Sequence, residues 1–181
     1  MKNKLLVSMY IFILTIITTN VYATNMEMKL NEEEVKNGDT ILITINVKNV
    51  TQENGINIIQ GKLEYDKDVF EKVENKDFEV KNNWSIVYNA ENTNSEGKFI
   101  LLNLSEGKKE DEELAELKLK VKENAKSTNT SIKLTEVCTV DGENIVKVEN
   151  NEKEIKIKGK FSFKNIFTNI KNTIFNIFNR K

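Results

Sequence analysis

The sequence predicts an all-β protein that folds as an antiparallel β-sandwich or jelly roll of about nine strands. Three observations carry this prediction. Apolar and polar residues alternate with a period of two in most segments between residues 41 and 148, which is typical of half-buried strands. Turn-forming residues separate these segments roughly every 8–12 residues. Strand and helix patterns do not alternate, which disfavours a parallel α/β sheet.

The clearest pair of strands lies at residues 41–48 and 58–65. The apolar residues of each strand share one face, which we expect to be buried. They are Ile41, Ile43, Ile45 and Val47 in the first strand and Ile59, Leu63 and Tyr65 in the second. Gln60, Lys62 and Glu64 then face solvent.

Further strands are predicted at residues 26–30, 70–74, 84–89, 99–104, 114–121, 127–140, 145–148 and 154–158. The segment 31–39 is predicted to be a loop, with Asn37-Gly38 as a tight turn. Residues 78–80 either extend the strand before them or belong to a loop. Asp141-Gly142 is the signal of a hairpin turn.

Two of these strands have distinctive patterns. Residues 99–104 are apolar on both faces, which predicts a central strand that is covered on both sides. Residues 114–121 match strand alternation at more positions than helical spacing, so a strand is favoured.

The two ends of the chain differ from the middle. A short basic segment, an apolar run over residues 5–17 and a small residue at Ala23 predict a secretory signal peptide over residues 1–23. An uncleaved membrane anchor is the alternative. Residues 24–159 then form one domain, which we expect to be secreted or extracellular.

The C-terminal tail, residues 160–181, is predicted to be an amphipathic basic helix. Between Phe161 and Lys181 its Phe and Ile residues recur at three- and four-residue steps, and Asn and Lys fill the other face. Asn and Lys interrupt it too often for a good membrane span. Its basic flanks favour a membrane surface, which would place the protein at the cell surface; packing on the sandwich or on another protein are the alternatives.

Composition excludes several functions. The chain has no His, which removes His-based metal sites and His-based catalysis. Its formal net charge of −1 disfavours nucleic-acid binding. Cys138 is alone and is interpreted as a small core residue. Asp66 and Asp68 are interpreted as turn residues rather than metal ligands. We therefore expect no cofactor, no metal and no enzymatic activity.

Five segments taken together resemble the cohesin domain family. GINIIQGKLEYDKDVFEKVE (55–74) resembles the third and fourth cohesin strands, and VKNGDTILITINVKNV (35–50) resembles the opening of the domain. FILLNLSEG (99–107) is similar to the sixth strand and the Glu-containing loop after it. ELAELKLKVKENA (113–125) and TSIKLTEVCTVDGENI (130–145) are similar to later strands. The resemblance covers residues 26–158.

The resemblance implies a nine-stranded jelly-roll β-sandwich that binds dockerin modules of polysaccharide-degrading enzymes. By position it implies a partner-binding site at Ile58, Gln60, Tyr88 and Glu106 on one exposed sheet face. Glu106 and Tyr88 match the family in type, whereas Ile58 and Gln60 stand where the family has Asn and Asp.

Two other functions remain open at this point. The same fold is shared by carbohydrate-binding modules, so polysaccharide is an alternative partner, and Trp84 and Tyr88 could stack on a sugar ring. On a sandwich strand such rings are more often part of the core. The third hypothesis is a structural protein held at a membrane surface by its tail.

Overall fold

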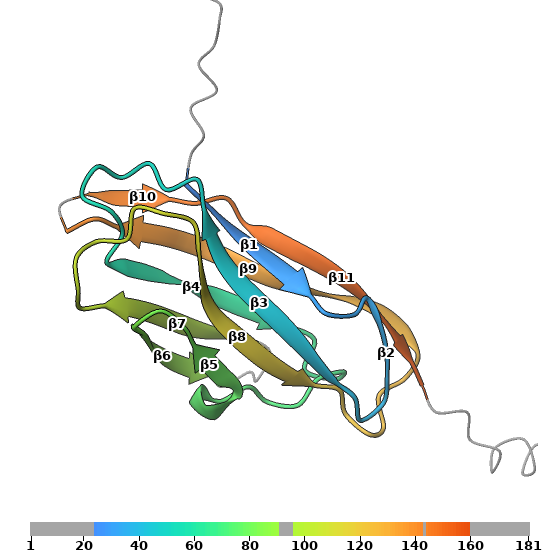
Figure 1. Ribbon diagram of the computed structural model, residues 1–181. Helices are drawn as coiled ribbons and strands as arrows, with labels where there is room; N and C mark the ends of the chain where they lie inside the picture. The colour runs from blue at the N-terminus through green and yellow to red at the C-terminus, as the bar shows by residue number, and fades with distance from the viewer. Residues whose placement is uncertain (1–23, 91–95, 143, 160–181) are drawn as a thin grey trace, which may run out of the picture.

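The computed structural model describes residues 24–90, 96–142 and 144–159, and the predicted signal peptide and C-terminal helix lie outside these residues. Within them the chain forms eleven strands and one short 3-10 helix, η1 (Figure 1). The strands are β1 (Asn25–Leu30), β2 (Glu34–Lys36), β3 (Thr40–Lys48), β4 (Ile58–Tyr65), β5 (Phe78–Val80), β6 (Trp84–Ala90), β7 (Glu96–Asn103), β8 (Glu112–Lys120), β9 (Thr128–Val140), β10 (Ile145–Lys147) and β11 (Asn151–Lys158). Helix η1 spans Asn75–Asp77.

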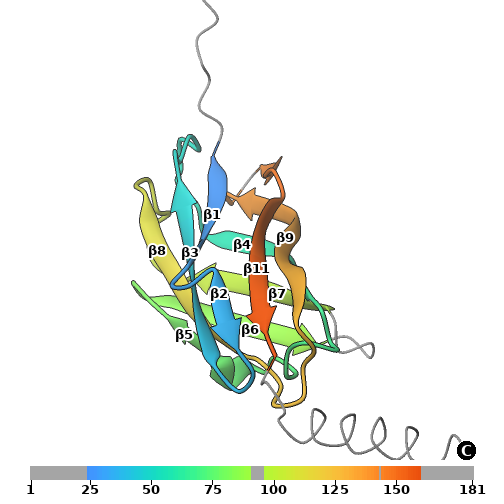
Figure 2. The same cartoon turned by 90° about the vertical axis from the view of Figure 1, so that its right-hand side faces the viewer.

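The strands form two sheets that pack face to face, so the predicted all-β sandwich is confirmed. The smaller sheet has the order β1-β3-β8-β5. The larger has the order β2-β11-β9-β4-β7-β6, with β10 paired to β9. Figure 2 shows β3 and β8 in one layer and β9 and β11 in the other. All pairs are antiparallel except β2 with β11.

The core lies between the sheets and is built from the alternating residues. Ile41, Ile43 and Ile45 of β3 are at most 2% exposed, as are Ile59 and Leu63 of β4. Each such side chain contributes about 1.5–3 kcal/mol when it leaves water. The whole hydrophobic cluster lies between residues 26 and 157.

Several local predictions are also confirmed. Residues 114–121 lie almost entirely in β8, which is a strand and not a helix. The turn at Asn37-Gly38 leads into β3, with Gly38 at φ +84°. Gly142, at φ +92°, lies in the hairpin between β9 and β10. Glycine adopts a left-handed φ at little cost, which explains why glycine stands at these two turns.

Two segments differ from the prediction. Residues 31–39 are not all loop, because β2 pairs in parallel with the distant β11. A strand of three residues is too short to show a period. Residues 70–74 are not a strand, because only Phe70 pairs, in an isolated bridge to Val121. Just before them the chain turns at Asp66, whose carbonyl accepts hydrogen bonds from the amides of Val69 and Phe70. These apolar residues are buried without joining a ladder.

Strand β7 is covered on one face only, so the prediction that it is covered on both is wrong. Phe99 and Leu101 point into the core, whereas Ile100 is 39% exposed and Leu102 is half-buried. The outer side of the large sheet is therefore partly apolar.

Side-chain amides close two open edges of the sandwich. Asn151 of β11 receives a hydrogen bond from the amide of Met28 and donates one to the carbonyl of Met26, both on edge strand β1. Asn75 of η1 accepts a 2.6 Å hydrogen bond from the amide of Tyr88 on edge strand β6. Such caps block the pairing of a further strand at these positions.

None of the described helices is long and apolar enough to cross a membrane.

Candidate docking face

The candidate site is the outer face of β6, β7, β4, β9 and β10. Directly paired residues lie on the same face of a sheet, so the strand registers define two rows that cross it. The first row is Ser85, Leu102, Ile58, Val140 and Ile145. The second row is Val87, Ile100, Gln60, Cys138 and Lys147. We call these two rows the apolar face.

Aliphatic side chains dominate the apolar face and reach solvent. Val87 is 55% exposed and Ile145 is 71% exposed. Leu104, which follows β7 in sequence, is 93% exposed. Single exposed apolar residues are ordinary, but a contiguous set is typical of an interaction surface.

Two of the predicted site residues lie side by side in the middle of this face. Ile58 belongs to the first row and Gln60 to the second. The Gln60 amide donates a 3.0 Å hydrogen bond to the Cys138 thiol on β9. Cys138 is buried, as predicted, but its sulfur lies on this outer side, under Gln60, rather than between the sheets.

Tyr88 does not belong to the face, which corrects the prediction that it is exposed there. Its side chain is 5% exposed and points into the core, where its ring packs 5.2 Å from that of Phe78. Burial raises the pKa of the Tyr88 phenol. The outward residue of β6 at this level is Val87.

Trp84 is also buried, and its indole Nε1–H donates a 2.7 Å hydrogen bond to Glu112 Oε1. The two rings that could have stacked on a sugar are therefore both covered. Stacking of Trp84 or Tyr88 on a sugar ring would need an exposed ring face, which neither residue offers.

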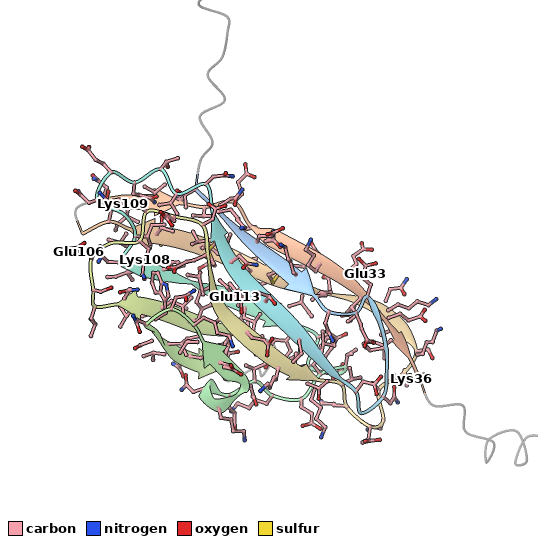
Figure 3. All side chains as sticks on the ribbon, in the orientation of Figure 1. Glu33, Lys36, Glu106, Lys108, Lys109 and Glu113 are labelled. Atoms are coloured by element: carbon pink, nitrogen blue, oxygen red, sulfur yellow. The ribbon has the colours of Figure 1, made fainter. Side chains whose placement is uncertain are left out.

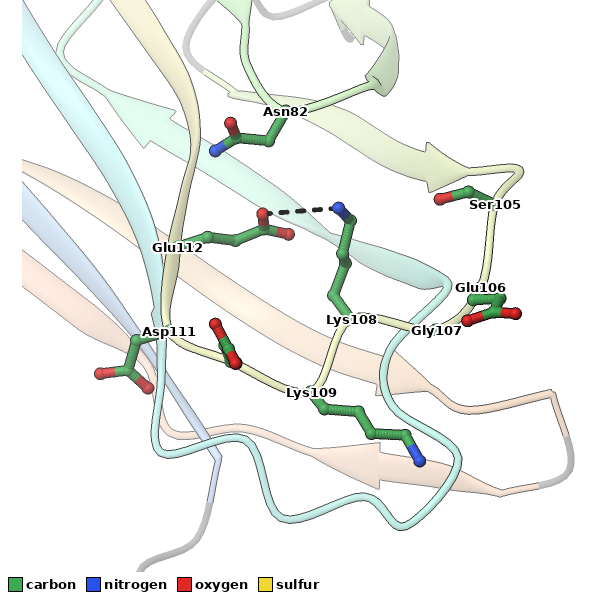
Figure 4. Close-up of a pocket in the computed structure, with 9 residues that line it drawn as sticks. Asn82, Ser105, Glu106, Gly107, Lys108, Lys109, Asp111 and Glu112 are labelled. Carbon is green, nitrogen blue, oxygen red and sulfur yellow. Dashed lines mark ion pairs between the residues drawn. The ribbon is translucent and has the colours of Figure 1, made fainter.

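Glu106 lies at the end of the face, in the loop between β7 and β8. Figure 3 shows it with Lys108 and Lys109 at the end of the sandwich opposite Glu33 and Lys36. In Figure 4 its side chain points away from the Lys108–Glu112 pair. Glu106 is exposed, so its carboxylate is available at the margin beyond the first row.

The loop that carries Glu106 is held in place by backbone contacts. The backbones of Ile56 and Lys108 exchange hydrogen bonds of 2.8 and 3.0 Å. Gly107 is so close to the preceding turn that a Cβ there would lie 2.1 Å from the carbonyl oxygen of Asn54. Asn57 donates from its side chain to the Ser105 carbonyl at 3.2 Å. These contacts hold the backbone that carries Glu106 in place.

A polar hollow of about 620 Å³ lies beside this loop (Figure 4). Lys108 and Glu112 form a 3.9 Å ion pair across it, and Asn82 and Asp111 are among the other polar residues that line it. Among the described residues no group of three or more potential metal ligands is assembled. The polar side chains that line the hollow can offer hydrogen bonds to a partner.

The other margin of the face is charged. Lys98 of β7 and Lys62 of β4 are directly paired in the next row. Glu136 forms a 2.7 Å ion pair with Lys62, and this contact lowers the pKa of the Glu136 carboxyl. A hollow of about 280 Å³ opens among these side chains, Gln60 and Ile100.

The outer face of the small sheet is different in character. Its exposed positions are rich in Lys and Glu that pair with one another, such as Lys118 with Glu79 at 3.7 Å and Lys120 with Glu71 at 3.0 Å. Paired charges of this kind are typical of a solvated surface. The contrast singles out the large sheet as the candidate site.

Sequence reasoning missed the aliphatic members of the face, above all Leu102, Ile100 and Val140. A signal was present for β7, because residues 99–104 are apolar on both sides of the strand except at Asn103. That pattern indicates either burial on both faces or one buried face and one binding face, and only the strand order distinguishes the two.

The fold and the apolar face define a class of protein: a β-sandwich module that carries its interaction surface on one sheet. The family model for the cohesin domain matches residues 26–157. The chain therefore belongs to the cohesin domain family, whose members are non-catalytic docking modules. Among curated protein sequences, none matches this chain significantly.

Solved structures show the same fold at low sequence identity. A cohesin module from a family 33 glycoside hydrolase of Clostridium perfringens has a TM-score of 0.66 and 19% identity, with 76% of this chain and 98% of that chain covered. The match to a type I cohesin–dockerin complex from Clostridium thermocellum has a TM-score of 0.58 and 20% identity over 74% and 99% of the two chains. A type II cohesin domain from Acetivibrio cellulolyticus has a TM-score of 0.56 and 14% identity over 74% and 95%.

Proposed function

We propose that this chain is a secreted docking module that binds a dockerin-type partner through its apolar face, in the service of extracellular polysaccharide degradation. One observation carries the proposal: the two rows that cross β6, β7, β4, β9 and β10 form a partly exposed surface in which six of the ten side chains are aliphatic. Several of the similar solved structures are complexes of cohesins with dockerins, which supports this kind of partner.

The geometry of the face suits a protein partner. It is broad and shallow, and it has aliphatic residues at its centre with charged residues at its margins. This is the usual anatomy of a protein interface, in which the centre is desolvated and the rim stays polar. Ile58 and Gln60 lie at the centre, and Glu106 lies at the rim.

Secretion and membrane attachment belong to the same proposal. The apolar segment before Ala23 supports export, and the basic amphipathic tail supports attachment to an anionic membrane surface. Docking and attachment are compatible, because the tail follows β11, which ends at Lys158, and the apolar face is built from other strands. The tail would then hold the docking module at the cell surface.

A binding array tests the docking proposal. Residues 24–159 contain the whole core and correspond to a module whose relatives stand alone in solved structures, so they serve as the probe. The array carries purified dockerin modules, including those of the Clostridium thermocellum complexes. We expect at least one dockerin to bind, and Ile58→Asp to weaken it at least tenfold, or about 1.4 kcal/mol.

The matched control is Leu42→Asp. Leu42 is half-buried on the outer face of the small sheet, so this substitution adds a charge of the same kind at a distance from the apolar face. We expect it to leave binding unchanged. Equal losses in both variants, or no dockerin bound by the wild type, would contradict the proposal.

A further inference from the structure

We infer that the fold seals the predicted leader-cleavage point, so that a leader peptidase can cut before Thr24 only until the domain has folded around that residue. This inference rests on the secretion part of the proposed function and adds an order of events to it. Cleavage adds one water across the bond between Ala23 and Thr24, and it leaves a carboxylate on the leader and an ammonium group on Thr24. The contacts of Thr24 and of the residues directly after it account for the protection.

Thr24 is buried although it is the first residue that the structure describes. Its exposed fraction is 2%. Its hydroxyl donates a 2.7 Å hydrogen bond to Gln52 Oε1 and accepts a 2.9 Å hydrogen bond from the amide of Thr51. Both partners belong to the loop between β3 and β4. The first residue after the predicted cleavage point is therefore a fixed part of the sandwich.

Gln52 ties Thr24 to the opposite sheet. It is 8% exposed, and its Nε2 donates a 2.6 Å hydrogen bond to the Thr139 hydroxyl. Thr139 is fully buried on β9 of the large sheet, whereas Thr24 leads into β1 of the small sheet. We call the chain of Thr24, Gln52 and Thr139 the polar bridge. Opening it would leave buried hydroxyl and amide groups without partners, which costs free energy.

The two residues after Thr24 are also held by the folded domain. Asn25 and Met26 are the first members of the antiparallel ladder between β1 and β3, where they pair with Lys48 and Val47. Met26 is 3% exposed, and its carbonyl accepts a 3.3 Å hydrogen bond from the side chain of Asn151 on β11. The chain on this side of the cleavage point is therefore anchored by side chains and backbone together.

A peptidase needs this segment in a different state. A protease binds several residues around the scissile bond in an extended form, so it cuts a folded substrate only when local opening frees them. Opening here breaks the polar bridge and the start of the β1 ladder. The leader is therefore removed from the unfolded chain. A molecule that folds first keeps its apolar segment, residues 5–17, and stays attached to the membrane.

A cleavage assay on the full chain tests this inference. Residues 1–181 are folded in detergent micelles and incubated with purified bacterial signal peptidase, and mass spectrometry follows the cleavage before Thr24. The unfolded reference is the same chain with Ile43→Asp and Leu117→Asp, which place charges in the core and leave the cleaved sequence unchanged. We expect the folded wild type to be cut at least about tenfold more slowly than this reference.

Loosening the polar bridge should restore part of the cleavage. Gln52→Ala removes the central amide, and Thr139→Val removes the hydroxyl at the far end and serves as the milder variant if Gln52→Ala does not fold. We expect the folded variants to be cut at least about threefold faster than the folded wild type. Asn129→Ala is the matched control, because it removes an exposed amide near the other end of β9, and it should be cut like the wild type.

The contrary outcomes separate the inference from the proposed secretion. Equal rates for the folded wild type and the unfolded reference would overturn the inference and leave secretion intact. Bridge variants that are cut no faster than Asn129→Ala would also overturn it. If the unfolded reference is not cut before Thr24, the proposed secretion is overturned, and the inference with it.

Discussion

The side-chain amide of Gln60 lies 3.0 Å from the sulfur of Cys138, and this hydrogen bond joins β4 to β9 at the centre of the apolar face. The contact holds the Cys138 thiol on the outer side of the large sheet, where a docked partner would cover it. It also makes Gln60 a fixed part of the surface rather than a mobile polar side chain, because its amide is committed to a neighbour.

The first prediction is that the Cys138 thiol reacts slowly in the folded protein and faster once its cover is removed. Cys138 is 9% exposed and lies under Gln60, and a thiol must be reached by the reagent to react. We expect reaction with an aromatic disulfide reagent to be at least about tenfold slower than in urea. Gln60→Ala should accelerate it. Equal rates in folded and unfolded protein would contradict this arrangement.

The second prediction concerns Gly97, which lies against the buried ring of Tyr88. A Cβ at Gly97 would be 2.2 Å from the Tyr88 hydroxyl oxygen, so Gly97→Ala forces the ring or the strand to move. We expect a loss of about 1–3 kcal/mol in the free energy of unfolding, measured by urea denaturation. Gly142→Ala is the comparison, because a Cβ there meets nothing within 4 Å. Its only expected cost is the backbone strain of an alanine at a left-handed φ. If Gly97→Ala were as stable as the wild type, the Tyr88 ring could not lie against Gly97 as described.

The third prediction concerns pH. Hydrogen bonds from Lys158 and Lys156 hold the pKa of Glu34 below its usual range, where β2 joins β11. Because the folded pKa is lower than the unfolded one, this stabilisation is present above the unfolded pKa and is lost as the pH falls through the folded pKa.

Glu34→Gln should therefore be slightly less stable than the wild type at neutral pH, and the difference should vanish in acid, once the pH lies below the folded pKa of Glu34. All three side chains are well exposed, so the effect is small and high salt should reduce it. Urea midpoints at the two pH values measure it. A difference that grows as the pH falls would have the wrong sign.

The fourth prediction concerns the tail, which lies outside the described residues. If residues 160–181 form a basic amphipathic helix, a chain spanning residues 24–181 should float with anionic liposomes, whereas the chain ending at Gly159 should not. Neutral liposomes should bind less. Equal flotation of the two chains, or none by either, would remove the membrane proposal and leave the tail as a packing element.

The strand pattern was predictable because the core is built from local alternation. Residues 41–48 and 59–65 have one buried face, and the period of two identifies it directly. Short β2 could not be found this way, because its pairing with β11 joins segments that are far apart in the sequence. Residues 70–74 show the opposite error: they are apolar because they are buried, and not because they form a strand.

The site was predictable only in part. Ile58 and Gln60 follow from the alternation of β4, whose core face is unambiguous. Strand β6 is apolar on both sides at this level, with Tyr88 facing inward and Val87 outward. Its pattern therefore does not say which side is the core. That choice depends on the packing of Tyr88 on Gly97 and Phe78, which only the assembled sheets provide.

The most direct test of the docking account is a methyl NMR titration. Residues 24–159, labelled at the methyl groups of Ile, are titrated with a dockerin that binds in the array. The account predicts large shifts at Ile58, Ile100 and Ile145, which line the apolar face, and little change at Ile41 and Ile43 in the core. Saturating binding that leaves Ile58 and Ile100 unshifted would contradict the account, because the partner would then occupy another surface.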